Sequence, residues 1–136
     1  MGLSEAARRF LSEKRFAVLA TIGADGLPQQ TVMWYELRGE MIIMNTAAGR
    51  LKDKHLRRDP RVSICVADGY SFVTITGTIE LDDDQSVAQE DIKGLAIRYH
   101  GQEKGNRQAR EQFSKQHRIT LRLPVTKALE YGLEDK

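Results

Sequence analysis

Short segments of alternating apolar and polar residues, separated by tight-turn dipeptides, constrain the fold of this chain more than any other feature. The dipeptides Asp25-Gly26, Arg38-Gly39 and Asp68-Gly69 each lie between two such segments. Glycine adopts the positive φ angles that tight hairpin turns require, and Asp-Gly is a strong hairpin signal. Strands joined by hairpins pair with their neighbours along the chain, so the sequence predicts antiparallel sheets.

The alternation predicts six or seven strands. Residues 71–81 alternate most regularly, and Gly77 among them lets so long a strand bend, as a closed barrel requires. Residues 41–44 are apolar on both faces, which indicates burial on both sides. The remaining strands are expected at residues 16–22, 28–37, 61–67 and 119–125, the last of them extended by residues 127–131.

Helices are expected in the connections between strands. Ser4 can cap a helix over residues 4–14, and Pro60 should end a basic helix over residues 50–59. A run of three aspartates should begin a helix over residues 82–100, because negative charge is favourable at a helix N-terminus. A loop at residues 101–105 should lead into a helix over residues 106–117. This pattern predicts an α+β, mainly β fold that closes into a small barrel.

Composition excludes several classes of protein. A chain of 136 residues is expected to form a single domain, here residues 1–136, and its one cysteine, Cys65, cannot form an internal disulfide. Neither a signal-peptide pattern nor an apolar run of about 20 residues is present, so we expect a cytoplasmic protein without a membrane partner. The three histidines lack the spacing of metal ligands, so no metal site is expected. Neither a nucleophile elbow nor a glycine-rich dinucleotide fingerprint occurs, so in an enzyme of this kind a cofactor would carry the chemistry.

Positive charge is concentrated in one stretch, residues 45–61, NTAAGRLKDKHLRRDPR. Six basic and two acidic residues give this stretch a net charge of +4, whereas the whole chain carries only +2. Arg50 and Lys52 fall at the start of the expected helix, where free backbone N–H groups already favour an anion. Small residues before them, including Thr46 with its hydroxyl, would let a phosphate approach. The alternative is a solvated helix held by ion pairs such as Asp53 with Arg57, and the residues alone leave both interpretations open. Acidic residues interrupt the basic ones and no aromatic platform accompanies them, so no nucleic-acid partner is expected.

Several segments together resemble a known family. They read LATIGADGLPQQTVMWYEL, IIMNTAAGRLKDKHLRRDPRVSICV and YSFVTITGTIEL, and a closing ITLRLPVTKALEYG follows them. In this order they are similar to the split-barrel family of pyridoxamine-phosphate-oxidase-like flavoproteins. The most specific part is the segment from Arg50 to Arg61, in which spaced basic residues are followed by Pro60.

The resemblance implies a homodimer of six-stranded antiparallel split barrels with short helices, in which the cofactor lies at the subunit interface and both chains build each site. Arg50 and Lys52 match the phosphate-binding basic residues of the family. The other cofactor-binding positions that the resemblance implies are Thr31 and Met33 along the ring system, Asn45 and Thr46 beside it, Lys54 as a weaker match, and Tyr70, which would reach the cofactor of the partner subunit.

Departures from the family pattern bear on the cofactor. Thr31 stands where pyridoxamine-phosphate oxidases have arginine, and Leu51-Lys52 stands where they have an Arg-Lys pair. The pattern is more similar to the branch that binds the deazaflavin coenzyme F-420, whose anionic tail Arg57 and Arg58 would neutralise. FMN is the alternative cofactor.

The activity implied is that of an F-420-dependent reductase, an oxidoreductase that transfers a hydride to an unsaturated small-molecule substrate. The alternatives are an FMN-binding oxidoreductase of the same family and a non-catalytic, cofactor-binding barrel. No catalytic residue is assigned: Tyr35 and Tyr70 are possible proton donors but also suit packing positions, and Trp34 could line the substrate pocket.

Overall fold

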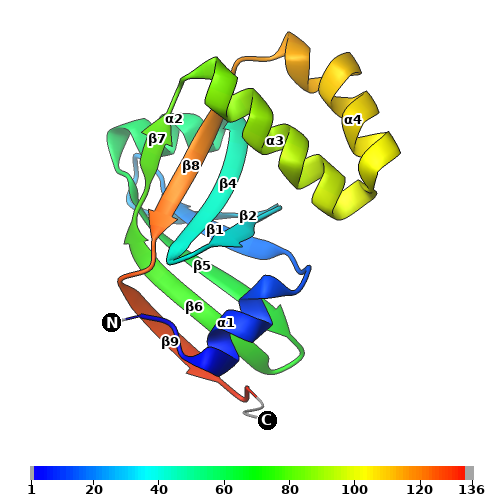
Figure 1. Cartoon of the computed structure of the whole chain (residues 1–136). Helices are drawn as coiled ribbons and strands as arrows, with labels where there is room; N and C mark the ends of the chain where they lie inside the picture. Colours follow the sequence, from blue (N-terminus) through cyan, green and yellow to red (C-terminus); the bar gives the residue numbers. More distant parts are fainter. Residues whose placement is uncertain (1, 134–136) are drawn as a thin grey trace.

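The computed structural model describes residues 2–133, whose strands form two antiparallel sheets (Figure 1). The five-stranded sheet, in the order β2-β1-β5-β6-β9, contains β1 (Ala17–Ile22), β2 (Pro28–Met33), β5 (Arg61–Asp68), β6 (Ser71–Thr78) and β9 (Lys127–Tyr131). The four-stranded sheet, in the order β3-β4-β8-β7, contains β3 (Glu36–Arg38), β4 (Met41–Ala47), β7 (Glu80–Asp82) and β8 (Arg118–Pro124).

Helices lie in the connections, as the sequence predicts; one begins after its expected cap, Ser4, whereas the helix expected from residue 82 begins at Gln85, after the cap Asp84, because Asp82 belongs to a strand. The side chain of Ser4 accepts a hydrogen bond from the backbone N–H of Ala7, and Asp84 accepts one from Ser86. The helices are α1 (Glu5–Ser12), α2 (Leu51–Arg58), α3 (Gln85–His100) and α4 (Gln102–Glu111), followed by the short 3-10 helix η1 (Phe113–Lys115). Within residues 2–133, no helix is long and apolar enough to cross a membrane.

The expected count of six or seven strands is too low, because three of the expected strands divide between the two sheets. Residues 28–37 contribute β2 to one sheet and β3 to the other, residues 71–81 contribute β6 and β7, and residues 119–131 contribute β8 and β9. The break between β6 and β7 falls at Ile79, two residues beyond the bend expected at Gly77. Ile79 is buried and donates its N–H to the carbonyl of Pro60. Strands that change sheets in this way let the two sheets enclose one core.

Both sheets contribute to the main core. The inward side chains of β1, β5 and β6 alternate with outward ones, as the sequence pattern predicts, and they meet the apolar face of β4 and β8. Tyr35 lies at the break between β2 and β3, is fully buried, and donates a hydrogen bond to the carbonyl of Leu11 in α1. Burial raises the pKa of Tyr35 to about 12. This side chain packs in the core, and it does not line the candidate site described below.

The prediction of a loop at residues 101–105 is wrong. Gly101 adopts a positive φ of 93° and ends α3, and α4 begins at the next residue. Gly105 then lies inside α4, where the absence of a side chain lets the helix approach α3: an ideal Cβ at Gly105 would lie 2.6 Å from the backbone nitrogen of Ile97. Glycine lowers helix propensity, so the sequence alone suggested a loop. Figure 1 shows α3 lying over β4 and β8, with α4 on its outer side.

Candidate functional site

A cavity of about 330 Å³ lies where the end of β2, the middle of β4 and the α3–α4 hairpin meet. Its walls are polar and apolar in about equal part, and two arginines, Arg50 and Arg118, line it. A cavity that combines apolar side chains with convergent polar groups is typical of a small-molecule site. The remaining lining residues are Val32, Met33, Trp34, Asn45, Ile92, Leu95, Gln108, Gln112 and Phe113.

The β4 strand separates two of the predicted site residues. The strand extends to Ala47, beyond the expected end at residue 44, so Asn45 and Thr46 point to opposite faces. Asn45 lies on the face that α3 covers, donates from Nδ2 to the carbonyl of Ala88, and lines the cavity. Thr46 shares the inner face with Met44, and its buried hydroxyl has no hydrogen-bond partner among the described residues. The structure therefore places Asn45, but not Thr46, at the cavity.

Arg118 is the most deeply buried cation at the cavity, with 4% of its surface exposed. It begins β8 directly opposite Ala47, so its side chain lies on the same face as Asn45. Its Nε donates to Asn45 Oδ1 at 2.9 Å and its Nη1 to Gln116 Oε1 at 2.6 Å. Burial, and secondly the nearby charge of Arg50, lower the pKa of Arg118 to about 10, so the guanidinium is still positively charged at neutral pH.

Arg50 and Lys52 flank the start of α2. Arg50 is the N-cap residue, and because a guanidinium has no acceptor atom, it cannot cap the helix N–H groups as serine or aspartate would. Burial lowers the pKa of Lys52, and the positive charges of Arg50 and Arg118 lower it further. These three residues, the cation cluster, therefore lie within electrostatic reach of one another, and among the described residues none of them forms an ion pair with a carboxylate. The arrangement favours an anionic ligand.

Two other cations of the basic stretch, Arg57 and Arg58, have protein partners. Arg57 forms ion pairs with Asp53 and Asp83 at 3.0 and 2.6 Å, and Arg58 donates to the carbonyl of Ile22. The ion pair of Asp53 with Arg57 is the one that the alternative interpretation named. The sequence therefore contains both features: a helix held by ion pairs along its length and an uncompensated cation cluster at its start.

The remaining predicted site residues divide by location. Met33 lines the cavity, whereas Thr31 lies two residues earlier in β2 and does not. Lys54 is exposed on α2. Tyr70 is 92% exposed in the turn between β5 and β6, away from the cavity of its own chain. Trp34 lines the cavity and stacks on Tyr99, with ring centroids 5.4 Å apart. Within residues 2–133, no group of histidine, cysteine and acidic residues could hold a metal ion.

Sequence reasoning missed Arg118 and the side chains that the α3–α4 hairpin contributes. Arg118 directly precedes the apolar alternation of residues 119–125, and the only local signal was a cation beside a buried strand. Its pairing with β4, which brings it to Asn45, joins residues 73 positions apart in the chain. Gln108, Gln112 and Phe113 come from a segment that reads as a polar helix with few apolar anchors.

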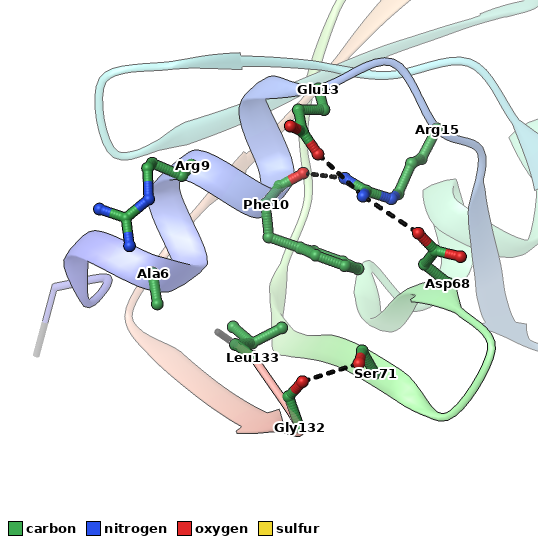
Figure 2. Close-up of a pocket in the computed structure, with 9 residues that line it drawn as sticks. All are labelled: Ala6, Arg9, Phe10, Glu13, Arg15, Asp68, Ser71, Gly132 and Leu133. Atoms are coloured by element: carbon green, nitrogen blue, oxygen red, sulfur yellow. Dashed lines mark hydrogen bonds and ion pairs between the residues drawn. The ribbon is translucent and has the colours of Figure 1, made fainter. Parts of the chain in front are cut away.

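A second cavity, of about 310 Å³, lies between α1 and the turn that joins β5 to β6 (Figure 2). Its central cation, Arg15, pairs with Glu13 at 2.8 Å and Asp68 at 3.3 Å and lies over the ring of Phe10. Because both carboxylates already neutralise Arg15, this cavity lacks the uncompensated charge of the first one. None of the predicted site residues lines it. The first cavity is therefore the better candidate for a cofactor.

Two antiparallel sheets around one core, with helices in the connections, define a split-barrel protein, and a cationic cavity lies at the end of β2. The family model described as pyridoxamine 5'-phosphate oxidase matches residues 3–122. The chain therefore belongs to this family, whose members in general bind FMN or coenzyme F-420.

Solved structures support the family assignment. A conserved hypothetical protein from Mycobacterium tuberculosis is 30% identical, with a TM-score of 0.80 over 95% of this chain and 84% of that chain. An F-420 reductase is similar in fold at 21% identity, with a TM-score of 0.75 over 93% of this chain and 98% of that chain. General stress protein 26 from Bacillus anthracis shares the fold at 12% identity, with a TM-score of 0.71 over 96% of this chain and 94% of that one.

Proposed function

We propose that this protein is an F-420-dependent reductase that transfers a hydride to an unsaturated small molecule. The observation that carries the proposal is the cation cluster of Arg50, Lys52 and Arg118, of which the two arginines line a cavity with mixed polar and apolar walls. A cofactor with a phosphate and a planar ring complements both parts: the cations would bind the phosphate, and the apolar side chains would contact the ring.

The residues of the chain supply position and environment. Arg50 and Lys52 hold the phosphate at the start of α2, where the backbone N–H groups of the first turn add donors. Met33 and Asn45, which line the cavity, would contact the ring, and Ile92 and Leu95 would give it an apolar wall. The bound deazaflavin supplies the hydride.

The choice of F-420 over FMN rests on the spacing of Arg50 and Lys52 and on the likeness to the F-420 reductase. The expectation that Arg57 and Arg58 contact an anionic tail no longer supports F-420, because both side chains already have protein partners. Arg57 pairs with Asp53 and Asp83, and Arg58 donates to the carbonyl of Ile22. FMN is the second candidate, since it presents the same phosphate to the same cations and the family model is that of pyridoxamine 5'-phosphate oxidase.

Competitive titration of the purified protein with coenzyme F-420 and FMN, read by cofactor fluorescence, tests this proposal. We expect micromolar or tighter affinity for F-420 and weaker binding of FMN. Reduced F-420 should then return to its oxidised, fluorescent form when an enone or quinone is added. Tighter binding of FMN would favour the second candidate, binding without hydride transfer would indicate a cofactor-binding module, and failure to bind either cofactor would refute the proposal.

We also propose that two copies of the chain associate through the outer face of the five-stranded sheet. The register places one row of uncharged side chains across all five strands, namely Val32, Val18, Cys65, Thr74 and Leu129. Leu129 and Val32 are 65% and 67% exposed, and Val32 also lines the cavity. A second copy on this face would bury the row and adjoin the cavity, as the family resemblance implies.

The dimer predicts a selective effect of charge on this face. Leu129→Glu should weaken association at least tenfold, because a carboxylate would be buried against an apolar partner. Leu27→Glu is the matched control, since Leu27 is also 65% exposed but lies in the turn between β1 and β2. Sedimentation velocity should give twice the 15.4 kDa chain mass for the wild type and Leu27→Glu, and a shift to the monomer for Leu129→Glu. A monomeric wild type at tens of micromolar, or equal behaviour of the two variants, would contradict the proposal.

A further inference from the structure

Arg118 presents unused hydrogen-bond donors to the cavity. A guanidinium carries five N–H donors. Nε bonds Asn45 and Nη1 bonds Gln116, but Nη2 has no hydrogen-bond partner among the described residues. Three N–H donors, two on Nη2 and one on Nη1, therefore remain available to a ligand in the cavity that Arg118 lines.

The other arginines on this face of the four-stranded sheet are compensated by acidic partners. Arg122, four residues further along β8, pairs with Asp82 at 2.9 Å. Arg38 in β3 pairs with the buried Asp91 at 2.9 Å. Arg118 is more deeply buried than either, yet no carboxylate of the described residues pairs with it: its side chain contacts two amides and the ring of Phe113, 5.0 Å away, and the nearby charge is that of another cation, Arg50. A buried charge without a counter-charge is unfavourable, so its presence here points to a role in binding an anion.

A connected polar network fixes the orientation of Arg118. Asn45 accepts from Arg118 and donates to Ala88, so its amide cannot rotate freely. Gln116 binds Nη1, and its own backbone carbonyl accepts from Gln89 of α3. A side chain held on two sides loses little rotational freedom when it binds a ligand, which favours tight binding.

We propose that Arg118 is an anion-binding residue of this cavity. Its free guanidinium N–H donors bind an oxyanion of a ligand that Arg50 also faces. The inference rests on the proposed function in that both concern one cavity, and it adds a residue and a ligand chemistry to it. The oxyanion belongs either to the cofactor, as phosphate, or to the substrate, as carboxylate. In both cases two parallel N–H donors would bind two oxygens, the geometry that arginine provides and lysine does not.

The test compares Arg118→Met with Arg122→Met, which removes a cation from the same strand face outside the cavity. Each protein is titrated with FMN and with riboflavin, which differ only in the phosphate, and with benzoate as a planar carboxylate. We expect Arg118→Met to bind either FMN or benzoate about ten- to a hundredfold more weakly, and riboflavin equally well. A lower affinity for FMN identifies the oxyanion that Arg118 binds as a phosphate, and a lower affinity for benzoate identifies it as a carboxylate. Either outcome supports the proposal.

Melting of the ligand-free protein separates binding from structure. Because Arg118 is buried without a counter-charge, Arg118→Met should melt no lower than the wild type. A lower melting temperature together with unchanged affinities would show that Arg118 is structural and would overturn the proposal. Should the methionine variant fail to fold, Arg118→Lys takes its place, because lysine keeps the positive charge but lacks the planar pair of N–H donors. If Arg118→Lys binds FMN and benzoate as tightly as the wild type does, the proposal is also overturned.

The same titrations distinguish this inference from the proposed function. If wild type and Arg118→Met bind FMN with the same affinity and also bind benzoate with the same affinity, the cofactor proposal stands and the inference is removed. If the protein binds benzoate or inorganic phosphate through Arg118 but binds neither F-420 nor FMN, the inference stands and the cofactor proposal is refuted. A wild-type protein that binds none of these anions would overturn the inference directly.

Discussion

Simultaneous replacement of Arg50 and Lys52 by alanine is expected to weaken cofactor binding about 100- to 1,000-fold. Each residue contributes a charge-assisted contact to the phosphate, and the loss of two such contacts corresponds to roughly 3–4 kcal/mol. Lys52 is half-buried, and its pKa is lowered by burial and by neighbouring cations, so an incoming phosphate relieves repulsion as well as gaining attraction. Fluorescence titration with coenzyme F-420 and with FMN measures the change.

Two controls locate this effect at the phosphate. The double variant Arg58→Ala with Arg61→Ala removes the same charge from the far end of the basic stretch, where Arg61 pairs with Asp59. It should change the affinity less than threefold, because exposed charges at that distance are screened. Riboflavin lacks the phosphate and should bind the wild type and both variants alike. An equal loss in both double variants would mean that the stretch acts through its net charge alone, which would refute the assignment of Arg50 and Lys52.

Gly105→Ala is expected to destabilise the protein by about 1–3 kcal/mol, although alanine is the better helix former. The added methyl group would lie within 2.7 Å of the backbone N and Cα of Ile97, and these backbone atoms cannot move aside as the end of a flexible side chain can. Helices α3 and α4 would have to separate, which would loosen the apolar cluster in which Phe113 packs against Ile92 and Leu95. These three residues line the cavity, so cofactor affinity should fall as well.

Gly94→Ala is the matched control for this prediction. Gly94 also lies inside a helix, α3, but an ideal Cβ there meets nothing within 4 Å. Its replacement should raise the free energy of unfolding by about 0.5–1 kcal/mol, because alanine loses less backbone entropy on folding. Urea denaturation measures both variants, and amide hydrogen exchange shows whether the loss in Gly105→Ala is concentrated in α4. Stabilisation of similar size in both variants would contradict the close approach of α3 and α4.

Local patterns predicted most of the secondary structure. The alternation of Val62, Ile64 and Val66 identified a strand and its buried face, Ser4 marked one helix start, and the run of three aspartates marked another to within three residues. These signals work because side chains alternate along a strand and because cap residues bond the nearest backbone N–H groups. The prediction of a loop up to Gly105 was wrong, because this position requires glycine for close packing against Ile97 of another helix and not for a turn.

The sequence by itself predicted most of the strands and turns and the concentration of positive charge around Arg50 and Lys52, because each depends on residues close together in the chain. Only the tertiary structure decided where strands change sheets, which of Asn45 and Thr46 faces the cavity, and that Arg118 joins the cation cluster. These features depend on pairing between β4 and β8, whose residues Asn45 and Arg118 are 73 positions apart. Local periodicity specifies which face of a strand is apolar, but the register of distant strands decides which polar side chains meet there.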